Sequence, residues 1–273
     1  MEELFDKIQS AASFIRQSVS AKPEVGIVLG TGLGGLADTI AIEHRLPYRD
    51  IPYFPQSTVM GHSGELLSGE IGGKKVLAMS GRFHFYEGYS MQEVTFPIRV
   101  MKALGINTLM VSNAAGGMNA AFKVGDIMII RDHINLMPEH PLRGKNDERL
   151  GVRFPDMSEP YSRQLIAIAE KIAREENLDI RTGVYAGVQG PTFETKAEYE
   201  YLHRIGADAV GMSTVPEVIV AVHAGLKVFA LSIITDLGIR EDDNPVTHEE
   251  VLAAASAATP KMTKLFQGMI GSM

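Results

Sequence analysis

The chain has 273 residues, of which 45% are hydrophobic and 22% are charged, and its formal net charge is -7. This composition is ordinary for a globular protein that is long enough to bury a large core. The acidic balance argues against a nucleic-acid or membrane-surface partner. Cysteine is absent, which excludes disulfides, thiolate nucleophiles and cysteine-ligated metals, so any catalysis must use oxygen and nitrogen groups.

The chain gives no sign of a membrane segment or of a second domain. No apolar run reaches the roughly 18 to 20 residues that span a bilayer, and the first residues are acidic where a signal peptide is basic. We therefore expect a cytoplasmic protein made of one domain, residues 1–273. The loop-rich stretch 138–160 is longer than usual connections, which favours a functional role such as a subunit interface.

The predicted elements alternate between helix and strand along the chain. Apolar residues at helical spacing predict an amphipathic helix before Pro23. Short β-branched runs predict buried strands at residues 25–29, 76–79, 108–111, 127–130, 184–188 and 228–234. Helix starts are predicted where a Ser or Thr precedes a Glu by three positions: Ser90 and Glu93, Thr195 and Glu198, Thr214 and Glu217, and Thr247 and Glu250. The alternation predicts an α/β fold with a mostly parallel sheet, whose ligand lies where strands pass into loops.

A glycine-rich segment, residues 30–35, follows the first predicted strand. Glycine lets the backbone approach an anion, and Thr31 offers a hydroxyl. The segment also matches a dinucleotide fingerprint, but that fingerprint needs a second strand where residues 46–52 carry two prolines. A dinucleotide-dependent oxidoreductase is therefore a distant alternative, and a tight turn without a ligand stays open.

The segment 81–89 follows another predicted strand and carries polar side chains at every second position. If the backbone stays extended, Arg82, His84 and Tyr86 share one face. Such a group suits an oxyanion, because Arg binds two oxygens at once and His can add a hydrogen bond. A surface strand with solvated side chains is the alternative. His62, between glycines, is a weaker candidate of the same kind.

Three further strand ends carry small or polar residues. Residues 113–117 present small side chains and backbone N–H groups, as needed beside a flat base or an anion. Glu194 stands before a predicted helix, where interaction with the helix dipole is the plain explanation. Ser213 lies where unpaired helix N–H groups favour anions. No zinc-peptidase pair, nucleophile elbow or Walker loop occurs, and the histidines show no metal-ligand spacing, so no metal is expected.

Taken in order, these segments resemble the trimeric type of purine-nucleoside phosphorylase. The match runs from the Thr31 loop to the helix after Thr247, and six motifs in sequence make it highly specific: Gly-Thr-Gly-Leu-Gly, Gly-His-Ser-Gly, Gly-Arg-Phe-His-Phe-Tyr-Glu-Gly, Asn-Ala-Ala-Gly-Gly, Gly-Pro-Thr-Phe-Glu-Thr and Gly-Met-Ser-Thr-Val-Pro-Glu. The resemblance implies a mixed, mostly parallel sheet, partly closed into a distorted barrel and surrounded by helices. It also implies a homotrimer.

The resemblance assigns a role to individual residues. It implies that phosphate is held by Thr31, His62, Arg82, His84, the Ala114 backbone and Ser213. It places at the ribose Tyr86, Met212 and His248. It places around the base Phe193, Glu194, Val210 and Asp236. Phe154 resembles the aromatic residue that a neighbouring subunit lends to the site.

The implied reaction cleaves the bond between a purine and its ribose. Positive charge builds on the sugar and negative charge on the departing base. Phosphate, a co-substrate, stabilises the sugar and attacks opposite the base to give ribose 1-phosphate, while Glu194 and Asp236 hydrogen-bond the base. His84 is expected to take part in catalysis from the phosphate side. No metal or organic cofactor is implied.

Base preference depends on Glu194 and Asp236. Purine-nucleoside members usually carry Asn at the position of Asp236, whereas a related branch that cleaves methylthioadenosine has Asp there and lacks the Glu. We expect 6-oxopurines to be preferred, with Asp236 protonated when one is bound, because like charge and burial raise a carboxyl pKa. A methylthioadenosine or other 6-aminopurine phosphorylase is the enzyme alternative. A nucleoside-binding protein without turnover is the alternative of another class.

Overall fold

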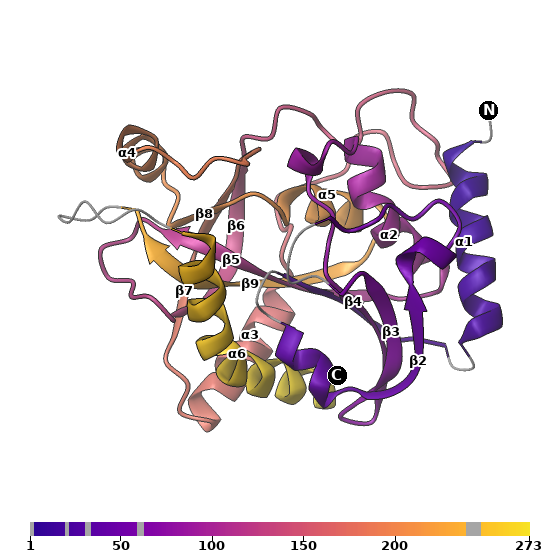
Figure 1. Ribbon diagram of the computed structural model, residues 1–273, viewed down its shortest axis with the longest axis horizontal. Coiled ribbons are helices and arrows are strands. Elements are labelled where there is room, and N and C mark those ends of the chain that lie inside the picture. Colours follow the sequence, from indigo (N-terminus) through magenta and orange to yellow (C-terminus); the bar gives the residue numbers. More distant parts are fainter. Residues whose placement is uncertain (1–2, 20–21, 31–33, 59–62, 239–246) are drawn as a thin grey trace.

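The computed structural model describes residues 3–19, 22–30, 34–58, 63–238 and 247–273, whose arrangement is shown in Figure 1. The strands of this described part are β1 (Val25–Leu29), β2 (Ala41–Pro47), β3 (Glu65–Ile71), β4 (Lys74–Ser80), β5 (Thr108–Gly117), β6 (Ile127–Asn135), β7 (Ile180–Gly187), β8 (Ala209–Gly211) and β9 (Lys227–Leu237). The α-helices are α1 (Leu4–Ser18), α2 (Met91–Ala103), α3 (Arg163–Glu175), α4 (Lys196–Arg204), α5 (Val215–His223) and α6 (His248–Gly271). Three short 3-10 helices are η1 (Gly34–Thr39), η2 (Tyr48–Asp50) and η3 (Phe85–Glu87).

The strands form one mixed sheet, half of which closes on itself (Figure 1). Its order is β2-β3-β4-β1-β5-β8-β7-β6-β9, and a further pairing of β5 with β9 makes a ring of the last five. Parallel pairings join β1 to β4 and β5, β5 to β9, and β7 to β6 and β8. The other four strands extend from the ring as an open wing. This arrangement confirms the expected α/β fold with a mixed sheet partly closed into a distorted barrel.

Helices cover both faces of the sheet, so the sheet divides two apolar cores. On one side α1 packs on α2 and α2 on α5, and on the other α3 packs on α6 and α6 on β9 (Figure 1). In β1, Val28 belongs to the first core, whereas Ile27 and Leu29 belong to the second. Successive side chains of a strand point to opposite faces, so a strand covered on both sides is apolar throughout.

Three of the four predicted helix starts are confirmed. Ser90, Thr195 and Thr247 each accept a hydrogen bond from the backbone N–H three residues on, with the Glu side chain returning to the cap. The fourth prediction is wrong in its detail. Thr214 precedes α5 but makes no side-chain cap bond, and Glu217 turns away to another partner.

The predicted strands all exist, but two outer strands were missed. β2 lies at the edge of the sheet and ends at Pro47, as expected of a residue that cannot donate to a ladder. β3 contains Gly69, where a Cβ atom would overlap the Ala41 carbonyl, so its apolar pattern is broken by a close backbone contact. The expectation that β5 ends before Asn113 is also wrong, because the strand continues to Gly117. No described helix is long and apolar enough to cross a bilayer.

Candidate active site

A cavity of about 110 Å³ lies at the carboxyl ends of β5, β8 and β9. We call it the strand-end cavity. It is lined by eleven of the predicted site residues: Arg82, His84, Tyr86, Ala114, Phe193, Glu194, Val210, Met212, Ser213, Asp236 and His248. These residues come from segments far apart in the chain, and the closed half of the sheet brings them together.

Arg82 is a buried cation with a fixed position. Its side chain is 1% exposed, and its Nε and Nη2 donate to Glu217 Oε1 and Oε2 at 3.1 and 3.0 Å. Its Nη1 donates to the Ser112 carbonyl at 2.8 Å and to Ser213 Oγ at 3.2 Å. Breaking a buried pair of this kind strands a charge, which costs about 3–5 kcal/mol. Glu217 therefore fixes the plane of the guanidinium.

Ser213 stands at the start of α5 in a chain of hydrogen bonds. Asn113 Nδ2 donates to Thr214 Oγ1 at 2.8 Å, and the Thr214 and Ser213 hydroxyl oxygens lie 3.4 Å apart. Ser213 Oγ also accepts from Arg82, so a Thr214 hydroxyl that donates to it leaves the Ser213 hydrogen for a ligand. Thr214 has φ +67° and is fully buried. A β-branched residue in that region is strained and persists only where its surroundings hold it.

His84 lies beside Arg82 and is held by Glu87. The His84 backbone N–H donates to Glu87 Oε1 at 2.7 Å, and Nδ1 lies 3.0 Å from the same oxygen. The other Glu87 oxygen accepts from the Thr58 backbone at 2.9 Å and from its hydroxyl at 2.5 Å. Burial opposes ionisation of Glu87, but these bonds outweigh it and lower its pKa to about 2. An ionised Glu87 selects the His84 tautomer that carries hydrogen on Nδ1.

The segment 81–89 is not the extended strand that the alternation assumed. The backbone is extended at His84 and then enters η3 at Phe85. Tyr86 still reaches the strand-end cavity, because its ring stacks on His84 with centroids 4.7 Å apart and planes at 16°. Burial raises the pKa of Tyr86 to about 12 and lowers the pKa of His84. Both side chains are therefore neutral at pH 7.

The lining of the strand-end cavity also holds two carboxyl groups joined by a phenol. Tyr199 of α4 donates from its hydroxyl to Asp236 Oδ2 at 3.1 Å, and it is also hydrogen-bonded to the Glu194 side chain. Thr235 Oγ1 donates to the other Asp236 oxygen at 3.1 Å. Burial raises the pKa of Glu194, and the charges of Asp236 and Glu198 raise it further. Such coupled carboxyls are the usual means of holding a proton near neutral pH.

The remaining predicted residues are placed differently. Val210 lies in β8, Met212 follows it, and His248 begins α6, so all three reach the cavity wall from separate elements. Phe154 does not reach this cavity. Its side chain is 87% exposed in the irregular stretch between β6 and α3. Thr31 and His62 lie outside the described residues.

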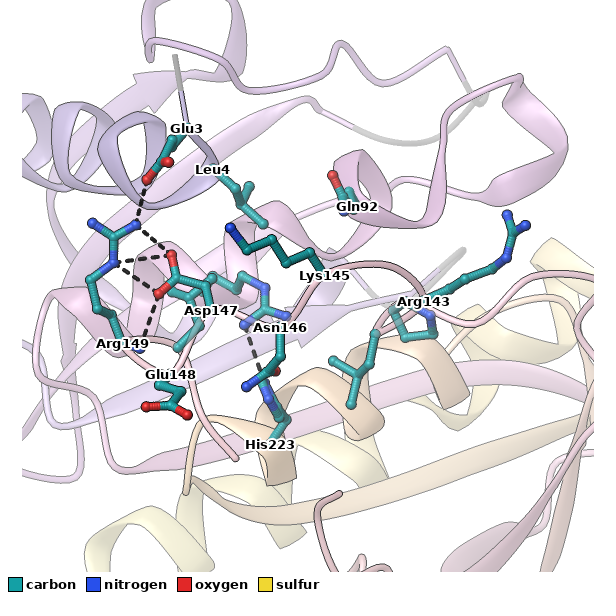
Figure 2. A pocket seen from close by; sticks show the side chains of 14 residues that line it. Glu3, Leu4, Gln92, Arg143, Lys145, Asn146, Asp147, Glu148, Arg149 and His223 are labelled. Atoms are coloured by element: carbon teal, nitrogen blue, oxygen red, sulfur yellow. Dashed lines mark hydrogen bonds and ion pairs between the residues drawn. The ribbon is translucent and has the colours of Figure 1, made fainter. Parts of the chain in front are cut away.

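A second cavity, of about 370 Å³, is larger but chemically different, and we call it the loop cavity. It lies between the start of α1, α2, His223 and the stretch 141–150. Figure 2 shows Arg149 turned toward Asp147 and Glu3, and its guanidinium bonds to both carboxylates. Arg99, which also lines the cavity, is 7% exposed and contacts His223 Nδ1 at 3.4 Å. Burial lowers the pKa of Arg99 to about 10.

Sequence reasoning missed three functional side chains of the strand-end cavity and its surroundings. Glu217 was assigned to a helix cap, Glu87 was read only as part of a motif, and Tyr199 was not singled out. For Glu217 a signal existed, because a cap glutamate in an apolar, buried helix start needs a cationic partner. For Tyr199 no local signal existed, since its partners lie on other elements.

Several known proteins that are similar to this chain in sequence and fold are purine nucleoside phosphorylases. The sequence profile of the phosphorylase superfamily matches residues 24–271. Purine nucleoside phosphorylase 1 of Bacillus subtilis (strain 168) is 52% identical over 265 residues, which are 97% of this chain and 98% of that protein. Two structures of Schistosoma mansoni purine nucleoside phosphorylase, one with inosine and one with adenosine, have TM-scores of 0.92 and 0.93 at 44% identity. Each covers 98% of this chain, and 96% and 97% of its own chain are covered.

The chain therefore belongs to the phosphorylase superfamily. Within that superfamily it stands with the purine nucleoside phosphorylases, which are enzymes of nucleoside metabolism. This confirms the family that the motifs of the sequence resemble. The dinucleotide oxidoreductase alternative is wrong.

Proposed function

We propose that the strand-end cavity catalyses reversible phosphorolysis of purine nucleosides, with 6-oxopurines such as inosine and guanosine preferred. The products are the free base and ribose 1-phosphate, or the deoxyribose analogue. The observation that carries the proposal is the polarity of the cavity. Its lining holds two separately bonded clusters, one of a buried arginine and a helix start and the other of two coupled carboxyls.

The arginine cluster suits phosphate. Arg82 and Ser213 supply fixed donors, the Ala114 backbone borders the same space, and α5 begins there with the positive end of its helix dipole. Arg82 is already neutralised by Glu217, so phosphate is held by directed hydrogen bonds more than by net charge. The assignment of Thr31 and His62 to phosphate remains a proposal from the family resemblance.

The carboxyl cluster suits a purine. Phe193 and Val210 offer apolar surface for the ring, while Glu194 and Asp236 face its polar edge. A 6-oxopurine presents N1–H, which an ionised Glu194 accepts, and O6 and N7, which need a donor. Negative charge gathers on the purine as the bond breaks, so a donor there stabilises the transition state more than the ground state. Of the other lining residues, Tyr86, Met212 and His248 are left for the ribose.

The domain organisation and the oligomeric state are argued from the family resemblance and from the long stretch 138–160. We propose that residues 1–273 form one domain and that the active unit is a homotrimer in which Phe154 enters the cavity of a neighbour. The exposure of Phe154 in a long irregular stretch supports this assignment. Light scattering should give three times the mass of the chain, and a fully active monomer would remove Phe154 from the site. The cytoplasmic location stays a prediction.

Chromatography of nucleosides incubated with and without phosphate tests the proposed function. Inosine should release hypoxanthine only when phosphate is present, and adenosine and methylthioadenosine should release adenine more slowly. Saturable binding without release of base would show a nucleoside-binding protein instead. Faster cleavage of adenosine or methylthioadenosine at neutral pH would overturn the 6-oxopurine preference.

A further inference from the structure

Tyr199 occupies a slot between the two carboxyls of the base site. Its side chain is 4% exposed, and its hydroxyl bonds to both Asp236 and Glu194. Two glycines make the slot. A Cβ atom at Gly116 would lie 2.7 Å from the phenol oxygen, and one at Gly238 would overlap the ring. The ring is therefore held in one place, and only its hydroxyl hydrogen is free to turn.

The two kinds of purine need the same number of protons on this pair of carboxyls. A 6-oxopurine needs Glu194 ionised, to accept N1–H, and Asp236 protonated, to donate to O6 or N7. A 6-aminopurine needs the reverse, because its N1 accepts and its amino group donates. Both complexes hold one proton in total, and they differ only in which carboxyl carries it.

The two carboxyls are not equally supplied with donors. The Thr235 hydroxyl lies 3.1 Å from Asp236 Oδ1 and 3.3 Å from the Ala115 carbonyl, so its one hydrogen can reach Asp236 whichever way Tyr199 turns. For Glu194, Tyr199 is the side-chain donor that the described residues provide. Glu198 is engaged in its helix cap and adds negative charge that opposes ionisation of Glu194. Ionisation of Glu194 thus depends on Tyr199 more than ionisation of Asp236 does.

We infer that Tyr199 is a specificity-determining residue whose hydroxyl couples Glu194 and Asp236 through one shared proton and turns to Glu194 when a 6-oxopurine binds. In the transfer, Glu194 gives its proton to the phenol oxygen, and the phenol gives its own proton to Asp236 Oδ2. The O–H bond of Glu194 breaks as a new one forms on the phenol, and the original O–H bond of the phenol breaks as one forms on Asp236. The phenol therefore stays neutral. Burial and the two carboxylates raise the pKa of Tyr199, so it passes a proton without becoming a phenolate. This inference rests on the proposed function.

The test compares Tyr199→Phe, which keeps the ring in its slot, with the wild-type chain on inosine and adenosine. Loss of a hydrogen bond to a charged group should lower kcat/KM for inosine about tenfold or more. Adenosine should change by less than about twofold, because Asp236 retains Thr235. The rising limb of the inosine pH profile should move to higher pH, since Glu194 loses the donor that favours its ionised form. Equal losses on both nucleosides would show a packing role and overturn the inference.

A matched variant and a second measurement make the test independent of folding defects. Adding Asp236→Asn to Tyr199→Phe should restore inosine cleavage, because it removes Asp236, the larger of the two carboxylate charges that oppose ionisation of Glu194; no restoration would contradict the coupling. In the wild-type chain, calorimetry in two buffers should give the same proton uptake for hypoxanthine and adenine. A difference of one proton would overturn the shared-proton account. If the wild-type chain releases base from neither nucleoside with phosphate present, it is the proposed function that fails.

Discussion

The strand-end cavity is smaller than the loop cavity, yet it is the one that has the features of a functional site. The loop cavity has more than three times the volume. Its main ion pair, Arg149 with Asp147, has side chains 46% and 27% exposed, whereas Arg82 and Glu217 in the smaller cavity are 1% and 3% exposed. Charges that water already solvates gain little from a ligand. The smaller cavity is the site because its polar groups are buried, fixed and pointed at one space.

The two arginines that are buried among the described residues, Arg82 and Arg99, provide the largest expected contrast. Arg82→Met strands Glu217 as a buried charge, so the free energy of unfolding should fall by about 3–5 kcal/mol. The phosphate KM should rise about 10- to 100-fold through loss of charged hydrogen bonds. Arg99→Met removes a desolvated cation to which no carboxylate of the described residues is bonded, so stability and kinetics should stay close to wild type. Urea unfolding and phosphate kinetics measure both, and a similar loss in the two variants would contradict the comparison.

The affinity of the strand-end cavity for phosphate should depend on pH, and the loop cavity should have no part in that dependence. Burial lowers the pKa of His84, and its Nδ1–H donates to Glu87, so Nε2 of this cavity-lining ring is an acceptor. A phosphate oxygen can hydrogen-bond to Nε2 of His84 only if that oxygen carries a proton. The phosphate KM should therefore rise with pH above neutrality, approaching tenfold per pH unit. A phosphate KM that is constant from pH 7 to 9, at saturating inosine, would show that no proton is shared.

Glu87→Gln should give a smaller effect that is visible in acid. A carboxyl with a depressed pKa adds stability above its unfolded value, and this stability is lost as pH falls through the folded value. The stability difference between wild type and variant should be full at pH 6 and disappear toward about pH 2. Asp147→Asn, at the rim of the loop cavity, is the matched control. Its effect should vanish in high salt, because screening acts on exposed charges. Urea midpoints across this pH range measure both.

Arg149→Ala should have the smallest effect. The pair that it forms with Asp147 and Glu3 is exposed, and its removal strands no buried charge. The thermal midpoint and the turnover of inosine should both match the wild type. A clear loss of turnover would show that the loop cavity contributes to the reaction through its contact with α1.

The sequence predicted the chemistry of the cavity better than its geometry. Arg82, Glu194 and Asp236 stand in motifs specific enough to identify the family, and the helix starts at Ser90, Thr195 and Thr247 follow from local hydrogen bonding. The closure of β5 on β9 could not be predicted, because each strand's pattern is the same in an open sheet. The helix-cap role predicted for Glu217 was wrong for the same reason. A local rule placed it in a cap, whereas a residue 135 positions away took it as a buried partner.

The pairing of β5 with β9 also has a consequence for how the chain folds. Thr108 of β5 stands opposite Lys227 of β9, so the ring closes only when segments more than a hundred residues apart meet. Contacts at such separation are slow to form, because the entropy of closing the loop is lost before the strands gain their hydrogen bonds. A growing chain holds β5 with one side unpaired until β9 has been made. That exposed strand edge is the part most open to pairing with a second nascent chain.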